Sequence, residues 1–293
     1  MVKHQRWCRF LQERFEGVNP DEDDMIFHGV ISHVVEFMVD TYGNFLMQKV
    51  MEVCREDQWM RILRVLVKDP TNFIRICLDK HGTRAVQKLI GIVHTREQVS
   101  LFMMALKTGV LELMLDLNGS HVIRCCMKTF GPQDNKFIYD TATMCCIEIA
   151  THQYGCCLLQ YCITHSTVIQ HEKLVSELVF NGLFLAQNCY GNYVIQYILE
   201  LKIQAVISTI IPQFRGNYVN LSTQKYSSNV VQKCLKTFGE KDCSSIINEL
   251  VSFPSFDQLI QDPYTNYVIQ TAFIVSRGSL HSLVTKTSHR ISQ

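Results

Sequence analysis

A seven-residue pattern of one amide, one flat or cationic side chain and two apolar residues recurs along this chain of 293 residues. Residues 42–48 read Tyr-Gly-Asn-Phe-Leu-Met-Gln, and residues 190–196 read Tyr-Gly-Asn-Tyr-Val-Ile-Gln. On a helix, the third, fourth and seventh residues of the pattern share one face. An amide presents a hydrogen-bond donor beside an acceptor, and a planar neighbour can stack on a flat ligand. This combination suits the edges and faces of nucleobases.

Eight copies of the pattern follow one another, and their third residues stand at positions 8, 44, 83, 120, 156, 192, 228 and 266. The third and seventh residues, predicted to contact base edges, are Cys8 with Gln12, Asn44 with Gln48, Thr83 with Gln87, Ser120 with Arg124, Cys156 with Gln160, Asn192 with Gln196, Ser228 with Gln232, and Asn266 with Gln270. The fourth residues, predicted to stack, are Arg9, Phe45, Arg84, His121, Cys157, Tyr193, Asn229 and Tyr267. A solvated helix face would instead carry Lys and Glu in no fixed order. Any single Gln could still serve a hydrogen bond between repeats.

The residues around each copy predict a helix with a defined start. The residue four places before the third position suits a helix N-cap in five copies, where it is Asp40, Asp79, Asp116, Asn188 or Asp262. In two further copies this residue is His152 or Gln224, which are weaker caps. The fifth and sixth residues are apolar in every copy, from Phe10 and Leu11 to Val268 and Ile269, and are expected in the core between repeats. An apolar helix precedes the pattern, as at residues 25–38, 59–67, 138–149 and 173–185. Two helices per unit of about 36 residues predict an all-α superhelical stack.

Composition narrows the class of protein. A hydrophobic share of 47% excludes a disordered chain, and a net charge of +1 argues against a polycationic nucleic-acid coat. The sequence shows neither a signal peptide nor a membrane span. The 13 cysteines include no C-x-x-C pair, so we expect reduced core thiols in an intracellular protein and neither a metal site nor a cofactor.

The copies at residues 81–87, 190–196 and 228–235 resemble the Pumilio-homology repeats of PUF proteins, and the resemblance covers essentially the whole chain. It implies an all-α, right-handed superhelical α-solenoid (crescent) of eight three-helix repeats in a single domain spanning residues 1–293. The repeats are expected at 1–17 (partial), 18–56, 57–94, 95–131, 132–167, 168–203, 204–240 and 241–277, followed by a partial C-terminal cap at 278–293.

The resemblance further implies that the concave face binds single-stranded RNA, one base per repeat, in mRNA 3′ untranslated regions. Such proteins repress translation or alter mRNA stability in the cytoplasm. We expect a monomer that has no enzymatic activity, does not bind membranes, and binds protein co-repressors on its convex face. The RNA would run antiparallel to the chain, with its 5′ base on the last repeat.

The base code of the family can be carried over pair by pair. Asn with Gln implies uracil, Cys with Gln implies adenine, Thr83 with Gln87 resembles an adenine pair, and Ser120 with Arg124 implies weak discrimination. The seventh repeat departs from the family, because Gln232 stands where Glu usually reads guanine. A carboxylate can accept two donors from guanine, whereas the mixed edge of an amide fits adenine. The predicted site is 5′-U-A-U-A-N-A-U-A-3′.

Two other classes of protein are alternatives to an RNA-binding repeat protein. A protein-binding solenoid of the HEAT or armadillo kind is the alternative, and the near-zero net charge favours it, since phosphate contacts normally supply much of the affinity. Local cations at Lys49, Lys88, Arg84 and Lys233 could compensate. An enzyme is not expected, because no catalytic motif is present and His152, Cys156 and Cys157 fall at repeat positions.

Overall fold

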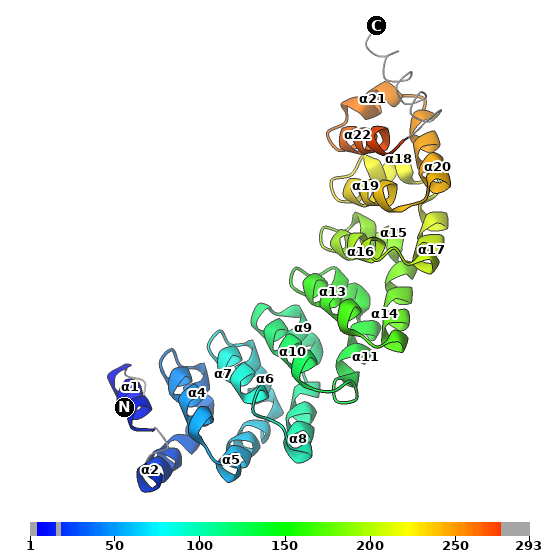
Figure 1. The fold of residues 1–293 in the computed structure, drawn as a ribbon. Coiled ribbons are helices and arrows are strands. Elements are labelled where there is room, and N and C mark those ends of the chain that lie inside the picture. Colours follow the sequence, from blue (N-terminus) through cyan, green and yellow to red (C-terminus); the bar gives the residue numbers. More distant parts are fainter. Residues whose placement is uncertain (1–4, 16–18, 277–293) are drawn as a thin grey trace. The chain divides into compact units, whose positions relative to one another are not determined.

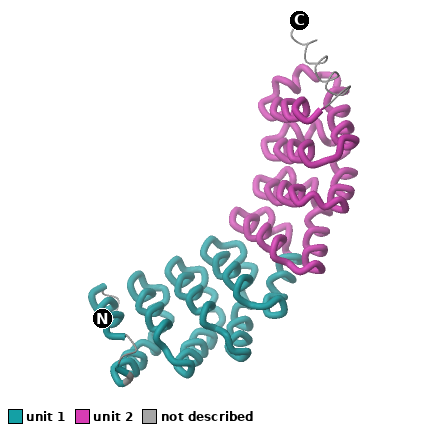
Figure 2. The backbone as a smooth tube through the Cα atoms, viewed as in Figure 1, with its two compact units in different colours: residues 1–144 teal, residues 145–293 magenta. Residues whose placement is uncertain are grey.

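The computed structural model describes residues 5–15 and 19–276, and every regular element within these ranges is a helix (Figure 1). The predicted all-α class is therefore confirmed. The chain divides into two compact units, residues 1–144 and 145–293 (Figure 2). The expected cap at 278–293 lies outside the described residues, and the eight repeat boundaries and the right-handed superhelix stay predictions.

Unit 1 is built from three helices per repeat. Its helices are α1 (Gln5–Arg14), α2 (Pro20–Ile31), α3 (Val34–Val39), α4 (Gly43–Val53), α5 (Glu56–Val67), α6 (Pro70–Leu78), α7 (Gly82–Ile90), α8 (Arg96–Lys107), α9 (Val110–Leu115), α10 (Leu117–Thr129) and α11 (Lys136–Met144). The helices that carry the pattern, α1, α4, α7 and α10, pack side by side in chain order. Helices α2, α5 and α8 form a second row (Figure 1), and α3 and α6 pack against helices of both rows.

Unit 2 repeats this arrangement. Its helices are α12 (Cys146–Ala150), α13 (Gly155–His165), α14 (Val168–Phe180), α15 (Gly182–Gln187), α16 (Gly191–Glu200), α17 (Gln204–Phe214), α18 (Tyr218–Ser222), α19 (Ser227–Thr237), α20 (Glu240–Val251), α21 (Phe256–Gln261) and α22 (Thr265–Val275). The pattern helices α13, α16, α19 and α22 again pack in chain order, and α14 packs against α17.

The prediction of one apolar helix before each pattern was wrong, because two helices occupy that place. The segment 173–185, for example, is divided between α14 and α15 at Asn181. Between α5 and α6, Asp69 accepts hydrogen bonds from the Thr71 and Asn72 amides at 3.0 and 3.2 Å, and Pro70 starts the new helix. Both helices face the same core, so the apolar periodicity continues across the break and conceals it.

The second residue of the pattern sits where two helices approach closely. A Cβ on Gly82 would lie 2.2 Å from the Ile76 carbonyl oxygen, and one on Gly155 would lie 2.5 Å from that of Ile149. Glycine removes this clash. Ser227 occupies the same place in α19 and donates its hydroxyl to the Leu221 carbonyl at 2.7 Å. The start of such a pattern helix is therefore packed against the end of the short helix that precedes it, as α7 is against α6.

The apolar pairs of the pattern form the core in seven of the eight copies. Leu46, Met47, Val230 and Val231 are fully buried, as are their counterparts, and Ile269 is 8% exposed. The first copy is the exception, since Phe10 is 45% exposed and contacts Trp7 edge to face, with ring centroids 6.0 Å apart. Helix α1 packs against α4 and α2.

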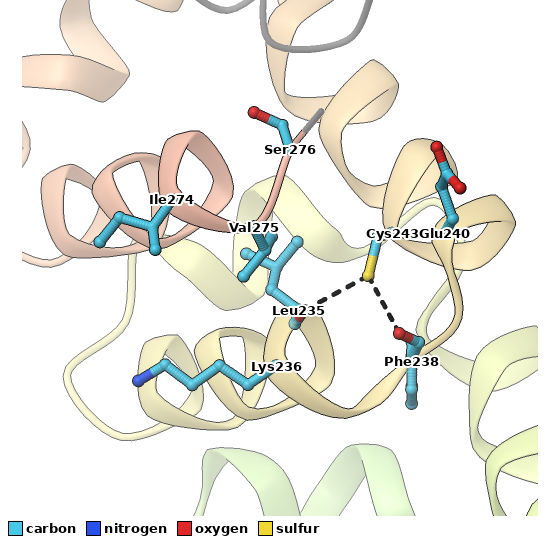
Figure 3. A pocket seen from close by; sticks show the side chains of 8 residues that line it. All are labelled: Leu235, Lys236, Phe238, Glu240, Cys243, Ile274, Val275 and Ser276. Atoms are coloured by element: carbon cyan, nitrogen blue, oxygen red, sulfur yellow. Dashed lines mark hydrogen bonds between the residues drawn. The ribbon is translucent and has the colours of Figure 1, made fainter. Parts of the chain in front are cut away.

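All 13 cysteines are free thiols. Burial raises the pKa of Cys54 to about 12 and that of Cys162 to about 12, so these thiols stay protonated at neutral pH. At the pocket in Figure 3, Cys243 donates its thiol to the carbonyls of Leu235 and Phe238 at 3.3 and 3.5 Å. Buried thiols such as those of Cys162 and Cys243 act as small core residues, and no group of three or more potential metal ligands occurs within 5–15 and 19–276.

Candidate nucleic-acid interface

The predicted cap residues hold the starts of the pattern helices. The Asp40 carboxylate accepts from the Tyr42 and Gly43 amides at 2.9 and 2.8 Å, and Asn188 does the same for Tyr190 and Gly191 at 2.9 Å each. Asp79, Asp116 and Asp262 make equivalent pairs of bonds. Each cap therefore fixes the helix one turn before the predicted contact residues.

The two weak caps behave as their side chains suggest. His152 accepts from the Tyr154 and Gly155 amides at longer distances of 3.3 and 3.4 Å. Gln224 instead donates its side-chain amide to Gln187 at 3.0 Å. The start of α19 thus lacks the two hydrogen bonds that Asn188 accepts at the start of α16, although both helices belong to unit 2.

The fourth residues of the pattern form an exposed row in each unit. All eight, Arg9, Phe45, Arg84, His121, Cys157, Tyr193, Asn229 and Tyr267, lie exposed on their helices. The three aromatic rings among them have nearly equal exposed fractions, which are 57% for Phe45, 56% for Tyr193 and 58% for Tyr267. Because isolated rings normally gain free energy by burial, this exposure is suited to stacking on a ligand.

The third residues lie beneath this row. Cys8, Asn44, Thr83, Cys156, Asn192 and Ser228 are buried, and Ser120 and Asn266 are half-buried. The Asn44 amide donates to the Asp40 and Thr41 carbonyls at 2.9 and 3.0 Å, which directs its oxygen toward the seventh residue. Asn192 makes the matching bonds to Asn188 and Cys189 at 2.8 and 3.0 Å.

The seventh residues complete the site. Six of them, including Gln48 and Gln196, are half-buried, and Arg124 and Gln270 are exposed. Gln48 donates to Asn44 at 3.1 Å and Gln196 donates to Asn192 at 3.0 Å, so each Gln amide is anchored by its own repeat. One amide hydrogen and the carbonyl oxygen of each Gln stay available to a ligand. Gln87 is anchored similarly by Thr83, at 3.2 and 3.3 Å.

The two cysteines of the fifth copy differ in environment. Cys156 is buried, and its burial, followed by the neighbouring Cys157, raises its pKa to about 12. Its neutral thiol donates to the Gln153 carbonyl at 3.5 Å. Cys157 is exposed in the row that elsewhere carries rings and cations, so this copy offers a smaller stacking surface.

The cations proposed as phosphate contacts are partly neutralised. Lys88 pairs with Glu52 at 2.7 Å, and Lys233 pairs with Glu200. Each pair joins one pattern helix to the preceding one. Arg84 is exposed in the stacking row, and Lys49 is half-buried beside Gln48. The surface therefore combines polar and planar groups with few free cations.

Sequence reasoning missed the contacts made by the residue that follows the seventh position. Lys88 and Lys233 form the ion pairs above, Tyr197 contacts the Thr164 hydroxyl, and Thr271 contacts the Gln232 side chain. These residues join neighbouring repeats. The signal that could have revealed them is their constant place, five residues after the third position of each copy.

The sequence matches the Pumilio-family RNA binding repeat over residues 8–31, 33–67, 72–103, 109–140, 145–179, 183–201 and 217–251. Pumilio homolog 11 of Arabidopsis thaliana is 49% identical over 287 residues, covering 98% of this chain and 51% of the relative. Pumilio homolog 8 of the same plant, described as chloroplastic, is 49% identical over 282 residues, covering 96% of this chain and 55% of the relative. The chain spans about half the length of these relatives.

Among solved structures, the Puf4 RNA binding domain bound to an HO endonuclease 3′ UTR recognition sequence is similar to this chain. The TM-score is 0.86 at 32% sequence identity, and the match covers 99% of this chain and 91% of that chain. The corresponding domain of Puf3, bound to a Cox17 3′ UTR sequence, matches with a TM-score of 0.72 at 26% identity, covering 99% and 86% of the two chains. The chain is an α-solenoid and belongs to the PUF (Pumilio) family of non-enzymatic RNA-binding repeat proteins.

Proposed function

We propose that this protein binds single-stranded RNA in mRNA 3′ untranslated regions and thereby represses translation or alters mRNA stability. The observation that supports the proposal is the repeated arrangement in both units, an exposed fourth residue beside an anchored, half-buried Gln. Exposed rings stack on bases while the amides meet their edges. The expected site is 5′-U-A-U-A-N-A-U-A-3′, read from the eighth repeat to the first.

Binding to fluorescent 8-mers tests the proposal at one stated salt concentration. The RNAs are UAUACAUA, UGUACAUA and a scrambled sequence of the same composition as the first. Preference for UAUACAUA supports both RNA binding and adenine at the second base. Preference for UGUACAUA would support RNA binding but contradict the prediction that Gln232 reads adenine. Equal and weak binding to all three RNAs would contradict sequence-specific binding.

The variant Gln232→Glu sharpens this test, because a carboxylate offers two acceptors to guanine. It should favour guanine at the second base by about tenfold or more, since a matched bidentate contact is worth about 1–3 kcal/mol. The matched control is Gln160→Glu in the fifth repeat, which should change preference at the fourth base and leave the second unchanged. A shift at the second base in both variants would indicate a general charge effect.

A specific surface of unit 2 supports the further proposal of a protein partner. Helix α14 exposes Val168, Ile169 and Phe180, with exposed fractions of 74%, 67% and 79%. Val168 and Ile169 begin this helix and Phe180 ends it, and large apolar side chains exposed in this way are found at interaction sites. With the chain tethered to a reporter mRNA, Phe180→Asp should relieve repression without changing RNA affinity. Unchanged repression would contradict the proposal that this surface of α14 binds a protein partner.

We further propose that the chain acts as a monomer in the cytoplasm. Within the described ranges, no helix is both long and apolar enough to cross a membrane. A fluorescent fusion of the full-length protein would distinguish the cytoplasm from the plastid named for one relative. Light scattering of the purified protein would test the monomer, and a mass of two chains would contradict it.

A further inference from the structure

A groove lies between α14 and α17, two helices of unit 2 that pack against each other. It consists of two adjoining cavities, of about 440 and 210 Å³. The Gln213 side chain on α17 donates to the Val179 carbonyl on α14 at 2.9 Å, which holds the two helices together at one end of the groove. Four residues line both cavities and join them into one groove, namely Val175, Ser176, Ala205 and Val206.

The corresponding helices of unit 1 are joined by ion pairs. Arg55, at the start of α5, pairs with Asp24 of α2 at 3.0 Å, and Arg64 of α5 pairs with Glu97 of α8 at 3.1 Å. Helix α17 contains no charged residue, so it forms no ion pair with α14. The junction of α14 and α17 therefore lacks the paired charges that would oppose the binding of an apolar ligand.

The two ends of the groove differ in polarity. Val179 and Phe180, at the end of α14, line the smaller cavity, and Phe180 is 79% exposed. Glu172, eight residues earlier and about 12 Å away along the helix, lines the larger cavity beside His171. No Lys or Arg lines either cavity, and Glu172 forms no ion pair within the described ranges. One end of the groove is therefore apolar and the other end is acidic.

The hydroxyl groups in the groove present acceptors to a ligand. Ser176 donates to the Glu172 backbone carbonyl at 2.6 Å, and Thr209 donates to the Ala205 backbone carbonyl at 2.9 Å. A backbone carbonyl only accepts, so the single proton of each hydroxyl is used within its own helix and the oxygen lone pairs are left for a ligand. The groove therefore suits a ligand that combines apolar groups with N–H donors or a positive charge.

We infer that this groove binds a short peptide segment of a protein partner, with apolar side chains at the Phe180 end and a Lys or Arg next to Glu172. The inference rests on the proposed function, in which a protein partner binds near α14, and it names the chemistry of that partner. Apolar side chains of the peptide fill the cavities, and its positive charge meets the carboxylate. RNA does not suit the groove, because Glu172 would repel its phosphates and no Lys or Arg in the lining would attract them.

Selection from a phage library of random 12-residue peptides tests the inference on the full chain. Phages that also bind Ala205→Arg are discarded, because Ala205 is exposed and an arginine there would fill the groove. The selected peptides should combine large apolar residues with Lys or Arg, and Ala205→Arg should weaken their binding about tenfold or more in fluorescence anisotropy. Ser208→Arg is the matched control, since Ser208 is exposed on α17 and lines neither cavity. A library that yields no peptide, peptides rich in Asp and Glu, or equal losses in both variants would overturn the inference.

An exchange of charges tests the role of Glu172. Glu172→Gln should weaken binding of a selected peptide about twofold to fivefold, the range of one exposed ion pair. Glu172→Lys should weaken it further and should bind better a peptide in which Glu replaces the basic residue. Equal affinities of the three proteins for both peptides would contradict the inference.

The same samples separate the groove from the RNA site. Affinity for UAUACAUA should stay within twofold in the Ala205→Arg and Glu172→Lys variants. A chain that binds the selected peptides but no RNA would contradict the proposed function and support the groove, whereas a chain that binds RNA but no peptide would overturn the inference alone. A mass of two chains that Ala205→Arg returns to one would assign the groove to a second copy and would also overturn the inference.

Discussion

Helices α16 and α19 are neighbours in unit 2 and both carry Gln at the seventh position, yet different contacts hold the two Gln side chains. In α16, Asn188 caps the helix, Asn192 anchors Gln196, and Tyr193 is exposed beside it. In α19, the cap position holds Gln224, and Asn229 stands where α16 has the ring. The Gln232 side chain contacts Thr271 of the next repeat. The comparison teaches that one repeat can be self-contained while the next depends on its neighbour.

The largest difference should come from the ring. Replacing Tyr193 by alanine removes a stacking surface that is 56% exposed, and base stacking contributes about 1–3 kcal/mol per base. Affinity for UAUACAUA should fall about tenfold to a hundredfold. Phe184 on α15 is 57% exposed and does not belong to the row, so Phe184→Ala is the matched control and should bind normally. Equal losses for both variants would contradict the role of the row.

The reverse change tests the other helix. Asn229 donates its side-chain amide to the Lys225 carbonyl at 3.2 Å, so it is held near the helix and offers little area for stacking. Asn229→Tyr should raise affinity, by about tenfold at most, because one further stacked base is gained. Competition between the variant and the unmodified protein for one labelled RNA measures this gain. A weaker complex would show that the second base does not lie over this residue.

The anchors should differ in their contribution to stability. Asn192 is 1% exposed and satisfies the Asn188 and Cys189 carbonyls, so Asn192→Ala should lower the free energy of unfolding by about 1–3 kcal/mol. Ser228 makes one long bond of 3.4 Å, and Ser228→Ala should cost about 0.5 kcal/mol or less. Urea titrations followed by circular dichroism measure both. Similar costs would mean that the third residue contributes equally in the two helices.

The caps offer a smaller and opposite change. Gln224→Asp would place a carboxylate where five other copies carry Asp or Asn, at the start of α19. The variant loses the 3.0 Å contact with Gln187 and gains a cap, so stability should rise by about 0.5–1 kcal/mol. Gln187→Ala removes the same contact without adding a cap and is the control. A less stable Asp variant would show that the contact between repeats outweighs the cap.

The sequence alone predicted the parts of the site that a single helix determines. The caps at Asp40 and Asn188 and the place of Tyr193 on the ligand-facing side both follow from position within one helix, whereas the burial of Asn192 was not predicted. The apolar periodicity did not reveal the third helix of each repeat, because a break of one residue between two helices, such as Asn181, does not interrupt the apolar pattern.

The contacts between repeats could not be predicted in the same way. Thr271 follows Gln232 by 39 residues, and only the packing of α22 on α19 brings the two side chains together. Phe10 illustrates the same limit, since its place in the pattern predicts burial while the helices around α1 leave it 45% exposed. Local rules therefore describe each repeat well and describe its interface with the next repeat poorly.

The smallest expected effect compares a charged cap with a neutral one. Partial burial would raise the pKa of Asp262, but hydrogen bonds from the Thr265 and Tyr264 amides, at 2.7 and 2.9 Å, and from the Thr265 hydroxyl outweigh it and lower the pKa. The carboxylate therefore stabilises the folded state above its unfolded pKa, and this contribution is lost as the pH falls through the folded pKa. Asn188 supplies the same two bonds without a charge and cannot contribute in this way.

Asp262→Asn should convert the eighth repeat to the neutral kind of cap. At pH 7 the variant should be less stable than the unmodified protein by a few tenths of a kcal/mol up to about 1 kcal/mol, the usual worth of a negative charge at a helix N-terminus. Once the pH has fallen below the lowered pKa of Asp262 the two should converge, because the carboxylate is then protonated and has lost the same charge. Urea midpoints measured across this range test the convergence. Parallel curves would mean that the geometry of the acceptor, which Asp and Asn share, supplies all of the capping free energy, and that the caps of α16 and α22 are equivalent at every pH.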